Sequence, residues 1–173
     1  MQSNYTAENK YRYIKYMDNY IPFILIPFIY WGVLHYLKKK DNLTSLKKIT
    51  LIIGIAAFSI TELGRSFYRP YIYANKIDDY FIADTIGNSS GTITAIFMVL
   101  TFSGKGTNKD WSIVIIIIAG LLFYELLNLT GKTSVDINDM IATVIFGIIS
   151  IFIYYFLLKK YDKNQNQNDS STV

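Results

Sequence analysis

Long apolar runs separated by short polar segments dominate this chain. A membrane-spanning helix needs about 20 mostly apolar residues, and five stretches approach that length once a few polar residues are admitted. The pattern therefore predicts an all-α fold, a polytopic membrane helical bundle of about five transmembrane helices. The predicted spans are residues 20–37, 49–66, 81–102, 111–130 and 139–158. They form a single domain over residues 1–160, and we expect the polar tail 161–173 to be disordered.

The amino-acid composition narrows the class of protein and the kinds of site that it can contain. The chain is 51% hydrophobic and 17% charged, which points away from an ordinary soluble domain. It has no cysteine, so disulfides, thiol catalysis and thiolate metal sites are excluded. The single histidine, His35, excludes a multi-histidine metal cluster, and we expect neither a metal nor a cofactor. The lysines behind the net charge of +4 lie beside apolar runs, so they indicate a lipid bilayer as partner rather than nucleic acid.

Charge asymmetry between the loops predicts an orientation. Five spans place the two termini on opposite sides of the membrane. Of the seventeen Lys and Arg residues, ten fall on the side of the loop 38–48 and the tail, and seven fall on the other. The positive-inside rule then places the C-terminus in the cytoplasm and the N-terminus outside the cytoplasmic (inner) membrane. Nine of the thirteen acidic residues lie on the outer side, which predicts an acidic outer face.

Carboxylates at the ends of the spans occur in two similar sets. The second span ends with Glu62 in "TELG", and the fourth ends with Glu125 in "YELL". The third span begins with Asp84, and the fifth begins with Asp139. This pattern predicts a parallel internal repeat of two helical hairpins whose acidic ends meet at the outer surface. A direct match of the letters, through "I-x-D" and "IA", instead pairs Asp79 with Asp139.

Helical spacing supports this pairing of hairpins. Each returning span carries a stripe of polar and small residues on one face, and such stripes let membrane helices pack closely. The stripes are Asp84, Asn88, Gly91 and Ala95 in one span and Asp139, Thr143, Gly147 and Ser150 in the other. Glu62 and Arg65 are three positions apart on one helix face, so these two can form an ion pair. Glu125 has Lys132 nearby in sequence, and Arg65 or Arg69 can reach it from the first hairpin.

The second hairpin resembles the VanZ-like family of small bacterial membrane proteins. That family shows a glutamate, a glutamine three residues later, a Gly-Arg pair, then D-x-x-x-N and a glycine. The corresponding positions are Glu125, Asn128, Gly131, Lys132, Asp139, Thr143 and Gly147, so Asn replaces Gln, Lys replaces Arg, Thr replaces Asn and the last glycine is displaced by one residue. The first hairpin keeps D-x-x-x-N-x-x-G, with Arg65 where a glutamine would follow Glu62. VanZ-like proteins are associated with resistance to lipid-anchored glycopeptides such as teicoplanin, so the resemblance implies an envelope role in contact with a lipid or cell-wall intermediate.

A second motif keeps an enzyme among the alternatives. The stretch "YFIADTIGNSSG" is similar to the F-N-x-A-D-[ST]-x-I-x-x-G motif of lipoprotein signal peptidases, and Asp84 matches one catalytic aspartate. Ile82 replaces the asparagine of that motif, the upstream elements are absent, and the stretch lies mid-chain. Two carboxylates suit peptide hydrolysis because one can act as base while the other stays protonated. The alternative is thus an intramembrane aspartic peptidase or lipid-modifying enzyme that uses Asp84 with Asp79 or Asp139.

The combined expectation is a non-enzymatic envelope protein that binds a polar lipid head group, a cell-wall intermediate or a membrane protein partner. Carboxylates would receive cationic or hydroxyl groups, and arginines would hold phosphate. Transport of a small cation or a proton is the third alternative, but the third and fifth spans carry no charge beyond their first turns. The predicted outward-facing site consists of Glu62, Arg65, Arg69, Asp84, Asn88, Glu125 and Asp139.

Overall fold

A computed structural model describes residues 19–128 and 137–170 of the chain. Within these residues every regular element is a helix and there is no strand, so the predicted all-α fold is confirmed. The elements are α2 (Ile21–Lys39), α3 (Ser45–Leu63), the π-helical turn η1 (Gly64–Tyr68), α4 (Arg69–Asn75), α5 (Ile82–Ser103), α6 (Asp110–Asn128) and α7 (Ile137–Ser170).

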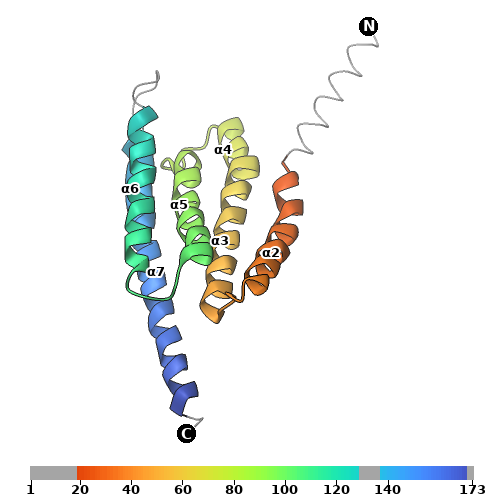
Figure 1. The fold of residues 1–173 in the computed structure, drawn as a ribbon. Coiled ribbons are helices and arrows are strands. Elements are labelled where there is room, and N and C mark those ends of the chain that lie inside the picture. The colour runs from red at the N-terminus through yellow and green to blue at the C-terminus, as the bar shows by residue number, and fades with distance from the viewer. Residues whose placement is uncertain (1–18, 129–136, 171–173) are drawn as a thin grey trace.

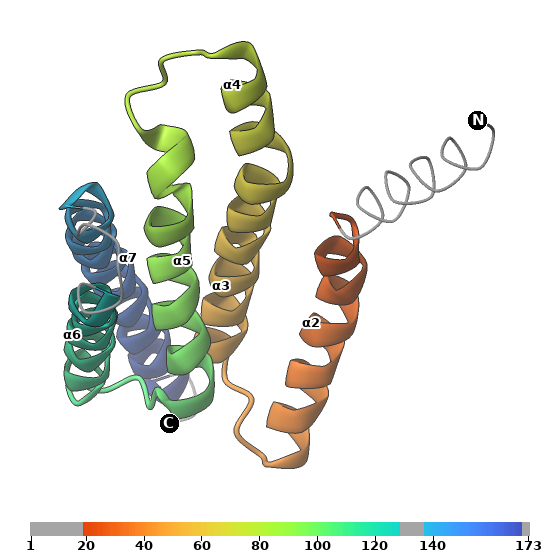
Figure 2. The same cartoon turned by 90° about the horizontal axis from the view of Figure 1, so that it is seen from above.

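The helices lie side by side, and each long helix runs antiparallel to the next (Figure 1). α2 lies at one edge of the bundle, α3 and α5 occupy the middle, and α6 and α7 form the opposite edge (Figure 2). α3, η1 and α4 follow one another without a break. We call the end that holds α4 and the start of α5 the Asp84 end. The opposite end, where the loop 104–109 joins α5 to α6, is the Asp110 end.

Within residues 19–128 and 137–170, four helices are long and apolar enough to cross a membrane, which indicates a membrane protein. They are Ile21–Lys39, Ile82–Ser103, Asp110–Leu127 and Ile137–Tyr161. α3, which corresponds to the predicted span 49–66, is not among them. Lys47, Lys48 and Glu62 restrict its uncharged run to residues 49–61, thirteen positions, which is shorter than the roughly 20 that a span needs.

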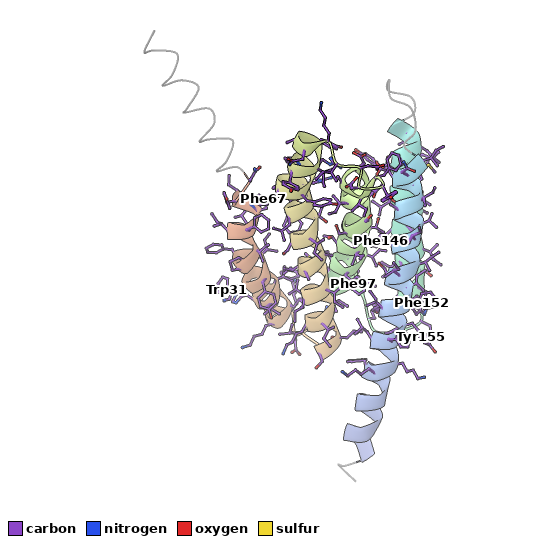
Figure 3. The ribbon with its side chains drawn as sticks, turned by 180° about the vertical axis from the view of Figure 1, so that it is seen from behind. Trp31, Phe67, Phe97, Phe146, Phe152 and Tyr155 are labelled. Carbon is purple, nitrogen blue, oxygen red and sulfur yellow. The ribbon has the colours of Figure 1, made fainter. Side chains whose placement is uncertain are left out.

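Large apolar side chains cover the outside of the bundle. Trp31 is 69% exposed and Phe152 is 59% exposed, whereas Phe97 is fully buried between helices (Figure 3). Soluble monomers rarely expose apolar surface over so many neighbouring positions. Contact with lipid tails accounts for it, because hydrocarbon removes the cost of exposing these side chains to water.

α5 is the central helix of the bundle. It packs most extensively against α3 and next against α7, and it also contacts α6, η1 and α4. Two hydroxyl–hydroxyl hydrogen bonds join α3 to α5. Thr61 Oγ1 donates to Ser90 Oγ over 2.9 Å, and Thr101 Oγ1 donates to Thr50 Oγ1 over 3.0 Å. All four side chains are buried, as polar contacts between membrane helices commonly are.

The predicted stripes of small residues pack differently from expectation. Thr143, Gly147 and Ser150 are buried on α7, but a Cβ at Gly147 would lie 2.8 Å from Ile118 Cδ1 of α6. At Gly147 the stripe therefore contacts the partner helix of its own hairpin. A Cβ at Gly91 of α5 would meet no atom within 4 Å. The prediction that the two stripes pack against each other is wrong at both glycines, because the helices are rotated about their axes relative to that arrangement.

The tail also differs from expectation. α7 continues through Ser170, so residues 161–170 are helical rather than disordered. The apolar part of α7 provides a nucleus, and the polar residues that follow contain no Gly or Pro to stop the helix. Residues 171–173 lie outside the described residues.

The close approach of α3 to α5 predicts a specific sensitivity at Gly64. A Cβ there would overlap the side chain of Ile86, whereas a Cβ at Gly120 of α6 would meet no atom within 4 Å. We expect Gly64→Ala to lower the free energy of unfolding by about 1–3 kcal/mol and Gly120→Ala to leave it undiminished. Unfolding in mixed micelles, titrated with sodium dodecyl sulfate, measures both. Equal denaturation midpoints for the two variants would show that α5 does not approach Gly64 as closely as the Ile86 contact requires.

Candidate functional site

The residues predicted to form a site all lie towards the Asp84 end. Consecutive helices run antiparallel, so the ends of α3 and α6 and the starts of α5 and α7 meet there (Figure 1). α3 and η1 supply Glu62 and Arg65, α4 supplies Arg69, α5 supplies Asp84 and Asn88, α6 supplies Glu125, and α7 supplies Asp139. Their contacts divide them into separate groups.

Arg69 binds backbone carbonyl groups of α5. Its Nε donates to the carbonyl oxygen of Ala83 over 2.8 Å, and its Nη2 donates to that of Asp84 over 2.5 Å. Both carbonyls belong to the first turn of α5. The planar guanidinium group makes two parallel hydrogen bonds that a lysine cannot reproduce. Arg69 therefore attaches α4 to α5, and these contacts occupy donors that were expected to hold phosphate.

The Asp84 carboxylate is also engaged within the first hairpin. The Tyr73 hydroxyl on α4 donates a hydrogen bond to Asp84 Oδ1. This hydrogen bond, together with partial burial and the negative charge of Asp84, raises the pKa of Tyr73 above its ordinary value. A second link between α4 and α5 thus lies beside the Arg69 contacts.

Asp79 organises the loop between α4 and α5. Its Oδ2 accepts a hydrogen bond from the backbone N–H of Ala83 over 2.7 Å, which satisfies a free donor in the first turn of α5. The backbone φ values of Lys76, Tyr80 and Phe81 are 52°, 55° and 65°. Residues other than glycine rarely adopt this left-handed region. Tyr80 and Phe81 are 84% and 61% exposed, as aromatic residues at a membrane boundary often are.

Arg65 and Glu125 approach α5 at adjacent positions. Arg65 is exposed, and its Nη2 lies 3.1 Å from the point that a Cβ on Gly87 would occupy. The absence of a side chain at Gly87 lets the guanidinium group lie against α5. At the next position, Asn88 Nδ2 donates a hydrogen bond of 3.4 Å to Glu125 Oε1 and so joins the two hairpins. Arg65 and Glu125 therefore reach the same level of the bundle.

Glu62 and Asp139 complete the predicted set. Glu62 is half-buried in the last turn of α3, and within residues 19–128 and 137–161 no ion pair joins it to Arg65. That predicted pair is wrong, because Arg65 turns towards Gly87. Asp139 is half-buried in the first turn of α7. Gly131 and Lys132, which carry part of the VanZ-like pattern, lie outside the described residues.

Sequence reasoning missed a buried carboxylate at the other end of the bundle. Asp110 is only 1% exposed. Its carboxylate accepts hydrogen bonds from the backbone N–H groups of Lys105, Gly106 and Thr107 at 2.7–3.2 Å. It also accepts one from the Tyr154 hydroxyl at 2.6 Å. An aspartate after a glycine-containing turn and before an apolar run is the available signal, since such residues favour helix starts.

Among the described residues, no three histidine or carboxylate side chains gather as they would around a metal ion. No known protein family, no curated protein and no solved structure matches this chain. A proposal about function therefore depends on the sequence and on the geometry of the site.

The two arginines should respond differently to a conservative change. Arg69→Lys keeps the charge but loses the paired hydrogen bonds to α5, so we expect the free energy of unfolding to fall by about 1–3 kcal/mol. Arg65→Lys should change it by less than about 0.5 kcal/mol, because Arg65 is exposed. The same denaturant titration in micelles compares them. A loss of stability as large in Arg65→Lys as in Arg69→Lys would contradict this division of roles.

Proposed function

We propose that this chain is a bacterial envelope protein of VanZ-like type that binds the polar head group of a lipid or cell-wall intermediate at the Asp84 end. The observation that carries the proposal is the exposed Arg65 guanidinium against Gly87, one residue from the hydrogen bond between Asn88 and Glu125. A cationic group and a carboxylate thus flank one turn of α5.

Arg65 is the group suited to an anionic ligand. In the part of the chain that the structure describes, Arg65 makes no hydrogen bond or ion pair, whereas Arg69 is committed to two carbonyl groups. A guanidinium group offers donors in a planar fork that matches phosphate oxygens. Arg65 also lies in a π-helical turn, an irregularity that is frequent at functional sites.

Glu125 and Asn88 are suited to the rest of a head group. Both side chains are half-buried, and the 3.4 Å that separates their polar atoms is long for a hydrogen bond. A hydroxyl or amino group of a ligand can insert beside them and donate to the carboxylate. A head group that carries both a phosphate and hydroxyl or amino groups would satisfy Arg65 and Glu125 together.

The proposal includes a membrane arrangement. Five spans, with α3 as the fifth, place the Asp84 end outside the cytoplasmic membrane and the C-terminus in the cytoplasm, as the distribution of Lys and Arg favours. α3 would cross the bilayer as the fifth span although its uncharged run is short, with its charges, Lys47, Lys48 and Glu62, in its first and last turns. The hairpins α3–α5 and α6–α7 would then be the two copies of the repeat, each with a glutamate near the end of its first helix and an aspartate at the start of its second.

The enzyme alternative receives less support from the geometry. A peptidase of the aspartic type needs two carboxyl groups close enough to share a proton. Asp84 instead accepts from Tyr73, and Asp79 accepts from the backbone of Ala83. These two carboxylates therefore serve the attachment of α4 and the loop to α5.

Binding to nanodiscs tests the proposal. We expect the purified protein to retain polyprenyl phosphate in phosphatidylcholine nanodiscs, as measured by native mass spectrometry. Arg65→Gln and Glu125→Gln should each weaken that binding about tenfold, the equivalent of one charge-assisted contact. Lys76→Asn is the matched control, since Lys76 is an exposed cation at the same end whose left-handed backbone conformation asparagine tolerates.

Two results would contradict the proposal. Equal retention by Arg65→Gln and Lys76→Asn would show that charge near the membrane surface, rather than this site, attracts the lipid. No retention by the wild-type protein, together with specific capture of another membrane protein at the Asp84 end, would favour a protein partner as the ligand.

A further inference from the structure

A cavity of about 400 Å³ lies at the Asp110 end, on the opposite side of the bundle from the proposed head-group site. The start of α3, the end of α5, the loop 104–106 and α7 enclose it. Its volume falls in the range of ordinary ligand pockets. The polar side chains that matter for its chemistry are Asn42, Thr44, Lys47, Lys105, Tyr154 and Tyr161.

Lys47 gives the cavity an unusual buried cation. It is only 5% exposed, and its Nζ donates one hydrogen bond, over 3.3 Å, to the carbonyl oxygen of Phe102. An ammonium group has three donors, and a buried charge is costly unless it is paired. Burial of this lysine against a polar cavity therefore indicates that an anion completes its contacts.

Asp110 is the acidic residue whose charge acts on Lys47, and it does not complete the hydrogen bonds of the ammonium group. Its charge attracts Lys47, but its carboxylate oxygens accept from three backbone N–H groups and from Tyr154. No ion pair within 4 Å links Lys47 to Asp110 among the described residues. The carboxylate shapes the loop, and the ammonium group faces the cavity.

Other features of the cavity favour an anion as well. Lys105 contributes a second, exposed cation from the loop. Thr44 caps α3 by accepting from the N–H of Lys47 over 3.2 Å, so the positive end of the helix dipole is directed at the cavity.

We infer that this cavity binds a phosphate group, and that its source is an anionic phospholipid in the leaflet at the Asp110 end. The lipid source follows from position, since α2 and α7 reach the same end of the bundle and place exposed lysines there. These lysines are Lys38, Lys39, Lys159 and Lys160. Basic pockets between membrane helices recognise anionic head groups in this way. The site is independent of Arg65 and Glu125 and of the function proposed for them.

The test uses the full chain in nanodiscs of phosphatidylcholine, with or without phosphatidylglycerol. We expect phosphatidylglycerol to raise the thermal unfolding midpoint and to remain bound in native mass spectrometry. Lys47→Gln should weaken its retention about tenfold, because glutamine can still donate to Phe102 but carries no charge. Lys48→Gln, the exposed neighbour on the same turn, should retain the lipid and its stabilising effect.

Three results would overturn the inference or its assignment to a lipid. Equal retention by Lys47→Gln and Lys48→Gln overturns the inference. If Lys47→Gln does not fold, Lys105→Gln on the exposed loop replaces it, and retention equal to wild type again overturns the inference. Millimolar inorganic phosphate added to phosphatidylcholine nanodiscs separates the two sources. The assignment to a lipid would be overturned if inorganic phosphate raised the thermal unfolding midpoint as much as phosphatidylglycerol does and if Lys47→Gln abolished that effect.

Discussion

The packing of α3 against α5 is the contact on which the rest of the bundle depends. α3 has the shortest uncharged run of the long helices, so apolar burial in lipid alone does not explain its position. Two buried hydroxyl pairs and the small Gly64 opposite Ile86 bring its axis close to α5. Because this pair is fixed along its whole length, η1 and α4 fall over the first turns of α5, and Lys47 falls beside its last turn. Both polar regions of the molecule are consequences of one helix pair.

At each end of the bundle a charged side chain is stabilised by backbone groups. The side chain is a cation at one end and an anion at the other. At the Asp84 end, the Arg69 guanidinium binds backbone carbonyl groups of α5. At the Asp110 end, a carboxylate binds backbone N–H groups of a loop. Each charge thereby holds a connection in place where the chain leaves the apolar region, where free backbone groups are costly. Arg65 and Lys47 keep donors that these contacts do not use, which is why binding is proposed at those two positions.

Apolar run length was sufficient to predict the helices but not their partners. The predicted spans 20–37 and 81–102 correspond to α2 (Ile21–Lys39) and α5 (Ile82–Ser103), because about 20 apolar residues define a span wherever they occur. Antiparallel order also placed the predicted site residues at one end. The role of Arg69, the Tyr73–Asp84 contact and the loop around Asp110 could not be predicted, since they depend on how each helix is rotated about its axis and on backbone geometry in loops. The polar composition of residues 159–170 does not distinguish a solvated helix from a disordered tail, because no Gly or Pro there ends the helix that α7 begins.

The central claim is that α3 crosses the membrane and separates the two polar ends. The chain has no cysteine, so single cysteines at exposed positions report topology without background. Lys40 precedes α3, Lys76 follows α4, and Lys109 follows α5. With a membrane-impermeant maleimide, the account predicts that Lys76→Cys reacts in intact cells, whereas Lys40→Cys and Lys109→Cys react only after permeabilisation. Reaction of Lys40→Cys and Lys76→Cys from the same side would contradict it, because α3 would then not span the bilayer.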